Sequence, residues 1–191
     1  MSASLFAVLA ALATGEPASP PPPSSSALRR AAEAGGRAWV RVLGTSTAAG
    51  VLVGSDGQVL TVEGLVHGTS ALVELGQTRR TARLVNRFPS LGLVLLAIDG
   101  DGPFAAPPAR LEPLTPDEWV VGIAEDGKTP RLGRVTRRNG AGSFEVSLRL
   151  PPGSPVLDGQ ARLVGVVTVR RNSSSRVTAL SSVRAQMGHA P

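Results

Sequence analysis

From residue 37 onward the sequence is a succession of short apolar segments separated by turn residues. The segments are rich in Val and Leu, and Gly, Asp, Ser and Pro stand between them. This pattern predicts short strands joined by tight turns. In the first half of the chain the expected strands are Trp39–Leu43, Gly50–Val53, Gln58–Val62, Ser70–Leu75, Thr81–Asn86 and Leu93–Ile98.

A second group of strand patterns follows a break at Asp99–Pro116, which is dense in Gly and Pro. The expected strands are Glu118–Ile123, Leu132–Thr136, Ser143–Leu150, Leu163–Arg170 and Arg176–Leu180. Two clusters of short antiparallel strands around a connector indicate an all-β fold of two small barrels or a sandwich. We expect barrel one at residues 37–98, the connector at 99–116 and a smaller barrel two at 117–180.

Short helices are expected on both sides of the strands. Ser26 is a good N-cap for a helix over Ala27–Ala34, and Gly35-Gly36 would stop it. A second short helix is expected at Ser181–Met187.

The N-terminus has the pattern of an export signal. The apolar run Leu5–Ala13 ends in Ala11-Leu12-Ala13, an A-x-A cleavage pattern, which predicts a signal peptide at residues 1–13. The run is too short to span a membrane, which takes about 20 residues. No Lys or Arg precedes it, so a frayed apolar N-terminus or a wrongly assigned start stays open as an alternative. Residues 14–26 are rich in Pro and Ser and are expected to form an extended linker.

Composition narrows the classes of function. The chain has no Cys, which excludes disulfides and thiolate metal sites. Its net charge is +6, but with two Trp, four Phe and no Tyr it lacks the stacking platforms of single-strand binders, which argues against nucleic acid as a partner. Asp99-Gly100-Asp101-Gly102 resembles the start of a calcium loop, yet Arg110 stands where the bidentate Glu is needed. We expect no metal and no cofactor.

The segment GVLVGSDGQVLTVEGLVHGTSALVEL (residues 50–75) resembles the first barrel of HtrA/Deg-type, trypsin-like serine proteases. In that family a strand ending in Leu-Thr leads into the catalytic histidine, as in L-T-N-N-H-V-V. Matched at Leu60-Thr61, the histidine position is Gly64. The aspartate strand, D-L-A-V-L in the family, is similar to Gly92–Ile98, which puts Gly92 at the aspartate.

The second half carries further landmarks in the family's order. Glu118–Ile123 is similar to the entry into the second barrel, and Leu150–Asp158 (LPPGSPVLD) to the nucleophile segment G-N-S-G-[GS]-P-L-V. This match puts Pro152 at the serine. The resemblance covers about residues 27–188 and implies a chymotrypsin-like double β-barrel in residues 27–191. The stretch Gly122–Leu150 is shorter than is usual in the family, which predicts that barrel two has lost loop length or a strand.

The resemblance implies a catalytic triad that this chain lacks. Acyl transfer needs a hydroxyl nucleophile, an imidazole base and a carboxylate that orients it, and Gly64, Gly92 and Pro152 supply none of these. Proline also lacks the backbone N–H that the nucleophile residue contributes to the oxyanion hole. Because glycine leaves the space of the lost side chains open, we expect a pocket in the cleft, lined by Leu65, Leu93 and Ser154.

Two functional hypotheses follow. The first is an exported, periplasmic or extracellular, catalytically inactive protease homologue that binds a peptide or protein in the cleft between the barrels. The second is an active serine endopeptidase with a relocated site, in which Ser154 attacks and His67 is the base, oriented by Asp99 or Glu63. The sequence leaves the ligand and the oligomeric state open.

Overall fold

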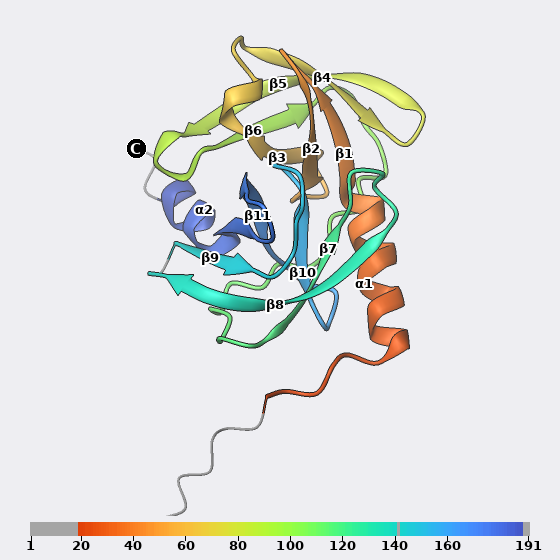
Figure 1. The fold of residues 1–191 in the computed structure, drawn as a ribbon. Helices are drawn as coiled ribbons and strands as arrows, with labels where there is room; N and C mark the ends of the chain where they lie inside the picture. Colours follow the sequence, from red (N-terminus) through yellow and green to blue (C-terminus); the bar gives the residue numbers. More distant parts are fainter. Residues whose placement is uncertain (1–18, 141, 189–191) are drawn as a thin grey trace, which may run out of the picture.

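The strand-rich sequence folds into two closed, six-stranded antiparallel barrels (Figure 1). The computed structural model describes residues 19–140 and 142–188. The predicted signal peptide and the first part of the linker lie outside the described residues. This architecture confirms the expected all-β double barrel.

Barrel one contains β1 (Trp39–Leu43), β2 (Thr47–Leu52), β3 (Gln58–Val62), β4 (Ser70–Leu75), β5 (Thr78–Phe88) and β6 (Leu93–Ile98). The strands follow the order β1-β2-β3-β6-β5-β4, and pairing of β1 with β4 closes the barrel. Its interior is mostly Val and Leu with Phe88, all buried. Two 3-10 turns, η1 (Glu63–Leu65) and η2 (Pro89–Leu91), follow β3 and β5.

Barrel two contains β7 (Trp119–Ile123), β8 (Pro130–Asn139), β9 (Ser143–Val146), β10 (Pro155–Asp158), β11 (Leu163–Arg170) and β12 (Ser175–Ala179). The order β10-β11-β12-β9-β8-β7 is closed by pairing of β10 with β7. The expectation of a lost strand is wrong, because β10 completes a barrel with as many strands as the first. The four residues of β10 are all buried. The strand was not expected because it directly follows Pro-Pro-Gly-Ser, a pattern typical of a turn.

The N-terminal helix α1 (Ser25–Ala38) is longer than expected. Its N-cap is Ser24, whose hydroxyl accepts a hydrogen bond from the Ala27 N–H. Gly35 does not stop the helix: it is buried where α1 meets barrel two, and a Cβ there would lie 2.6 Å from Ile123 Cγ1. The glycine therefore permits close packing of the helix on the barrel.

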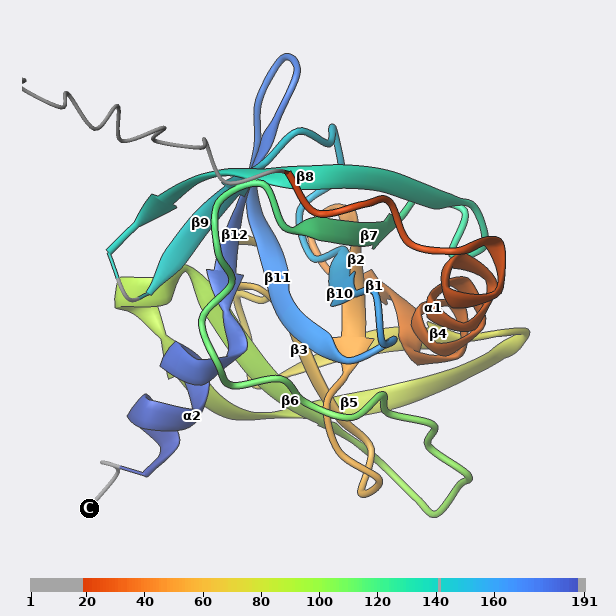
Figure 2. The ribbon, with the colours of Figure 1, turned by 90° about the horizontal axis from the view of Figure 1, so that it is seen from below.

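The C-terminal helix α2 (Leu180–Met187) buries Leu180 and Val183 with the core of barrel one. The connector between β6 and β7 crosses from one barrel to the other (Figure 2). It is tied to β11, since the Arg110 N–H donates to the Leu163 carbonyl at 2.9 Å. Across residues 19–140 and 142–188, neither helix has the length and apolar character to cross a membrane.

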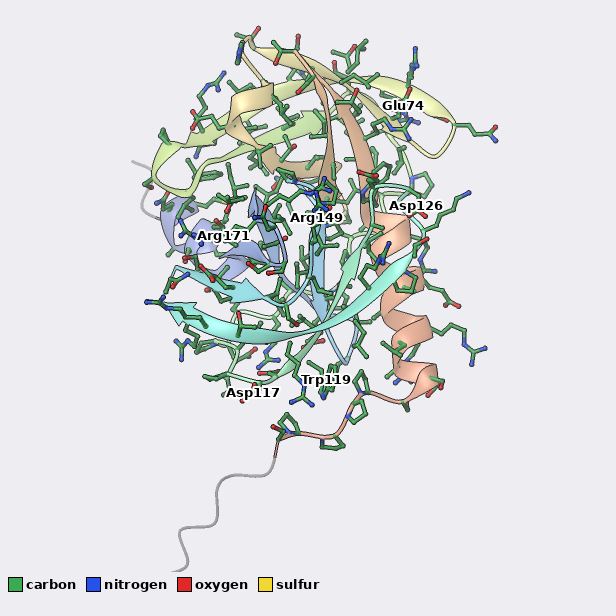
Figure 3. The ribbon with its side chains drawn as sticks, in the orientation of Figure 1. Glu74, Asp117, Trp119, Asp126, Arg149 and Arg171 are labelled. Atoms are coloured by element: carbon green, nitrogen blue, oxygen red, sulfur yellow. The ribbon has the colours of Figure 1, made fainter. Side chains whose placement is uncertain are left out.

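The turn between β7 and β8 is organised by the Asp126 carboxylate (Figure 3). Its Oδ1 accepts from the N–H groups of Lys128 (2.9 Å) and Thr129 (2.8 Å), and its Oδ2 accepts from the Thr129 hydroxyl. The Thr129 hydroxyl and these backbone donors lower the pKa of Asp126 from 3.8 to about 2. The turn thus depends on a charged carboxylate.

We therefore expect Asp126 to contribute to acid stability. Because its pKa is lower in the folded state, its stabilisation is fully present above about pH 4 and is lost as the pH falls towards 2. Asp126→Asn should lower the midpoint of thermal unfolding at pH 5–6, and this difference should shrink towards pH 2. Melting curves of both proteins across this range test the prediction, and a difference independent of pH would contradict it.

Candidate active-site cleft

Two of the three predicted triad positions, Gly64 and Gly92, lie next to each other in barrel one. Gly64 is in η1, directly after β3, and Gly92 ends η2 in the left-handed conformation (φ 67°) directly before β6. The Glu63 N–H donates to the Gly92 carbonyl at 3.0 Å, which holds the two turns together. A Cβ on either glycine would meet no atom within 4 Å. Both positions therefore border open space.

The loop that carries Pro152 is pressed against barrel one. Gly153 has φ 87°, and a Cβ on it would overlap the carbonyl of Ala49 in β2. The same Ala49 carbonyl accepts a hydrogen bond from the Thr61 hydroxyl at 2.8 Å, on the strand that leads to Gly64. On the other side, the Gly153 N–H donates to the Val167 carbonyl of β11 at 2.7 Å. The loop thus sits where the two barrels meet.

The backbone on both sides of Pro151 has no free donor for an oxyanion. The N–H of Leu150 donates to Ser175 Oγ at 3.0 Å, and that hydroxyl in turn donates to the Leu148 carbonyl at 2.7 Å. Pro152 has no N–H to offer. The Leu150 side chain is fully buried in the core of barrel two, where it packs against Gly122. Sequence reasoning missed Ser175, because a serine at a strand end has no distinguishing pattern.

The structure does not bring the alternative pair Ser154 and His67 together. Ser154 is fully buried and its hydroxyl has no hydrogen-bond partner, whereas His67 is exposed in the loop after η1. Glu63 lies 3.8 Å from Arg87, and Asp99 pairs with Arg83 at 2.6 Å. Both candidate carboxylates therefore have arginine partners.

A cavity of about 390 Å³ opens beside Gly92, with a different lining from the expected one. None of Leu65, Leu93 and Ser154 lines it. Leu93 and Ser154 are fully buried, and the Leu93 and Leu65 side chains pack with the core of barrel one. Two hydroxyls lie in the wall of the cavity: Thr178 Oγ1 donates to the Leu91 carbonyl and is 3.3 Å from Thr168 Oγ1. The lining residues include Ser90, Leu91, Gly92, Ser143, Thr168 and Thr178.

Arg149 is a further residue beside the nucleophile loop that sequence reasoning missed. It is exposed, directly precedes Leu150, and lies between the two barrels (Figure 3). In the described part of the chain its guanidinium has no hydrogen bond or ion pair. The same residues contain no group of His, Asp and Glu side chains that could hold a metal ion.

Two closed six-stranded antiparallel barrels joined by a connector define the chymotrypsin-like fold of the trypsin-like serine proteases. Solved structures with this fold include the serine endoprotease of Yersinia pestis, with a TM-score of 0.74 and 17% identity over 87% of this chain and 66% of that one. The Rv3671c protease of M. tuberculosis, in an inactive form, has a TM-score of 0.67 and 18% identity over 88% and 96% of the two chains.

A third similar structure is the HtrA-type protease AlgW with a tripeptide, with a TM-score of 0.70 and 17% identity. The match covers 84% of this chain and 62% of the AlgW chain, so this chain spans less than two thirds of the AlgW and Yersinia chains. No protein-family model matches the sequence, and no curated protein matches it. At these identities the likeness establishes the fold.

Proposed function

We propose that this chain is a catalytically inactive homologue of the HtrA-type serine proteases, which uses the cleft between its barrels to bind an extended peptide or protein segment. The observation that carries the proposal is the state of the nucleophile loop. By the resemblance, Pro152 takes the serine position, and the N–H of Leu150 is already bonded to Ser175 Oγ. Without a nucleophile or an oxyanion donor, the loop has no means of acyl transfer.

The binding role is supported by the course of β11. Strand β10 pairs with β11 as far as Val166, and Gly153 and Ser154 of the Pro152 loop bond to the backbone of Val167. Beyond Val167, β12 is the one strand paired with β11. Thr168 and Val169 then form part of the wall of the cavity beside Gly92, and Val169 is 42% exposed. An extended peptide can add to such a strand edge through main-chain hydrogen bonds. Arg149 favours a ligand with an acidic side chain.

The lack of catalysis is tested with a fluorophosphonate probe, which labels activated serines, and with casein as substrate. We expect neither labelling nor hydrolysis by the wild-type chain. Ser154→Ala is the matched control. Labelling of the wild type that disappears in Ser154→Ala would overturn the proposal in favour of the relocated site.

Peptide binding is tested by selecting a random peptide library on the wild-type chain. Selected peptides should cross-link to a photoreactive residue placed at Val169 and not to one at Leu132, which is similarly exposed (37%) on β8. Equal cross-linking at both positions, or no selected peptide, would count against the binding role.

The proposal includes export to the periplasm or the extracellular space, with removal of residues 1–13. It is supported by the apolar run and its A-x-A pattern. N-terminal sequencing of the mature protein would then begin at Thr14.

A further inference from the structure

The proline tract of the linker lies on barrel two. Figure 3 shows Trp119, at the start of β7, beside this N-terminal segment. The indole Nε1–H donates to the Pro20 carbonyl at 2.9 Å. Pro20, Pro21 and Pro23 line a groove of about 240 Å³ together with Trp119. The contact joins residues 99 positions apart in the sequence.

Four consecutive prolines favour a polyproline II helix. Each residue that precedes a proline is driven to extended or polyproline II angles, and each proline holds φ near −65°. Ser24, the N-cap of α1 that follows Pro23, is also extended, with φ −61° and ψ 158°. With about three residues per turn, Pro20 and Pro23 lie on the same edge of the helix. These are the two ends of a P-x-x-P pattern, and Pro22 does not line the groove.

The hydrogen-bonding groups of the tract and the groove are complementary. Prolines have no N–H, so the tract offers only carbonyl acceptors. The Trp119 indole offers only a donor. The Arg134 guanidinium covers a face of the indole, 4.1 Å from the ring centroid, which holds the ring in place. Gly159 faces Pro23: a Cβ on Gly159 would lie 3.8 Å from the Pro23 Cβ, an ordinary van der Waals distance.

The other wall of the groove is a set of fixed ion pairs. The buried Asp158 carboxylate accepts from Arg162 Nε at 2.8 Å and lies 3.5 Å from Arg110 Nη1, and Arg110 also pairs with Glu118. Burial would raise the pKa of Glu118, but the Arg110 and Thr115 donors outweigh it and lower that pKa. In the described part of the chain, the two non-glycine residues with positive φ, Asp117 and Ala161, are next to groove residues. Strained backbone of this kind gathers at binding sites.

We propose that the groove around Trp119 is a recognition site for proline-rich, polyproline II segments, and that Pro20–Pro23 of the same chain occupies it in cis. The carbonyl-to-indole hydrogen bond and the P-x-x-P edge on an aromatic groove are the features by which such segments are bound. The site then accepts a proline-rich segment in trans when its own tract is displaced. It is separate from the cleft at Gly64 and does not depend on loss of catalysis.

The test uses the full chain with Pro20–Pro23 all replaced by alanine, and a fluorescent peptide of residues 17–26 (PASPPPPSSS). The tethered tract competes at an effective concentration in the millimolar range. The peptide should therefore bind the alanine variant at least about tenfold more tightly than the wild type. Adding Trp119→Phe to the alanine variant should weaken binding by about tenfold, because the donor is lost. Trp39→Phe, the matched control at the other tryptophan, should leave the affinity unchanged.

A second measurement covers the case in which a variant folds poorly. The chain has two tryptophans, so the indole N–H signals of the wild type and the alanine variant can be followed by hydrogen exchange. The Trp119 N–H should exchange severalfold faster in the alanine variant, with Trp39 as the internal reference. Equal peptide affinity for wild type and alanine variant would overturn the proposal. So would equal binding of a peptide in which Pro20–Pro23 are replaced by alanine, or an exchange rate at Trp119 that does not change.

Discussion

Gly153→Ala should destabilise the protein by about 2–5 kcal/mol, enough to lower the unfolding midpoint by roughly 10 °C. A residue with a Cβ costs about 1–2 kcal/mol in the left-handed conformation, which Gly153 adopts with φ 87°. The new Cβ would also overlap the Ala49 carbonyl, and overpacking against fixed backbone adds about 1–3 kcal/mol. The effect is large because Gly153 joins β2 of one barrel to β11 of the other. Thermal unfolding monitored by circular dichroism measures it.

Gly76→Ala is the matched control. Gly76 has φ 61° in the turn between β4 and β5, but a Cβ there meets no atom within 4 Å. The free energy of unfolding of this variant should fall only by the conformational cost of the left-handed residue, about 1–2 kcal/mol. If both variants melt at the same temperature, close contact of the Pro152 loop with Ala49 is not what holds the loop in place.

Restoring the triad side chains should not restore hydrolysis. The triple variant Gly64→His, Gly92→Asp and Pro152→Ser supplies an imidazole, a carboxylate, a hydroxyl and one backbone N–H. It leaves Leu150 buried in barrel two with its N–H bonded to Ser175 Oγ. Pro151 also stays before the nucleophile and fixes φ near −65°. One missing oxyanion donor costs about 10²–10³ in kcat, and a displaced nucleophile adds to that loss.

Pro152→Ala is the control for this experiment, with casein and an activated ester as substrates. Hydrolysis by the triple variant clearly above this control would show that the loop is still preorganised, and that only three side chains separate it from an enzyme. A further variant with Leu150→Gly separates the two causes, since it returns the loop glycine of the family motif. A gain only in that variant would assign the remaining loss to Leu150.

The strands that the sequence predicted best are those with a continuous apolar pattern between clear turns. β1, β3, β4, β6 and β11 have the expected bounds. β8 spans Pro130–Asn139, whereas Leu132–Thr136 was expected. The apolar pattern did not reach its two ends, because the residues there are mostly exposed and polar. Their strand conformation comes from pairing with β7 and β9, which a local pattern does not contain.

The helix and the site show the same limit. Gly35-Gly36 reads locally as a helix stop, and only the Ile123 side chain, far along the chain, explains a glycine inside α1. The expectation that Gly64 and Gly92 lie close together came from the order of the family landmarks along the sequence. The Ser175 hydrogen bond, the burial of Ser154 and the Trp119 groove depend on tertiary contacts between distant segments, so no spacing along the sequence could indicate them.

Helix α1 has a consequence for the order of assembly. It leads directly into β1 of barrel one, but it packs on β7 and β10 of barrel two. Its buried Gly35 needs Ile123 and Leu157, which follow by about a hundred residues. During synthesis the N-terminal segment must therefore wait until most of the chain has emerged, while barrel one has all of its own strands by Ile98. Helix α1 thus precedes both barrels in the sequence but is among the last elements to reach its native contacts, because these contacts require β7 and β10 of barrel two.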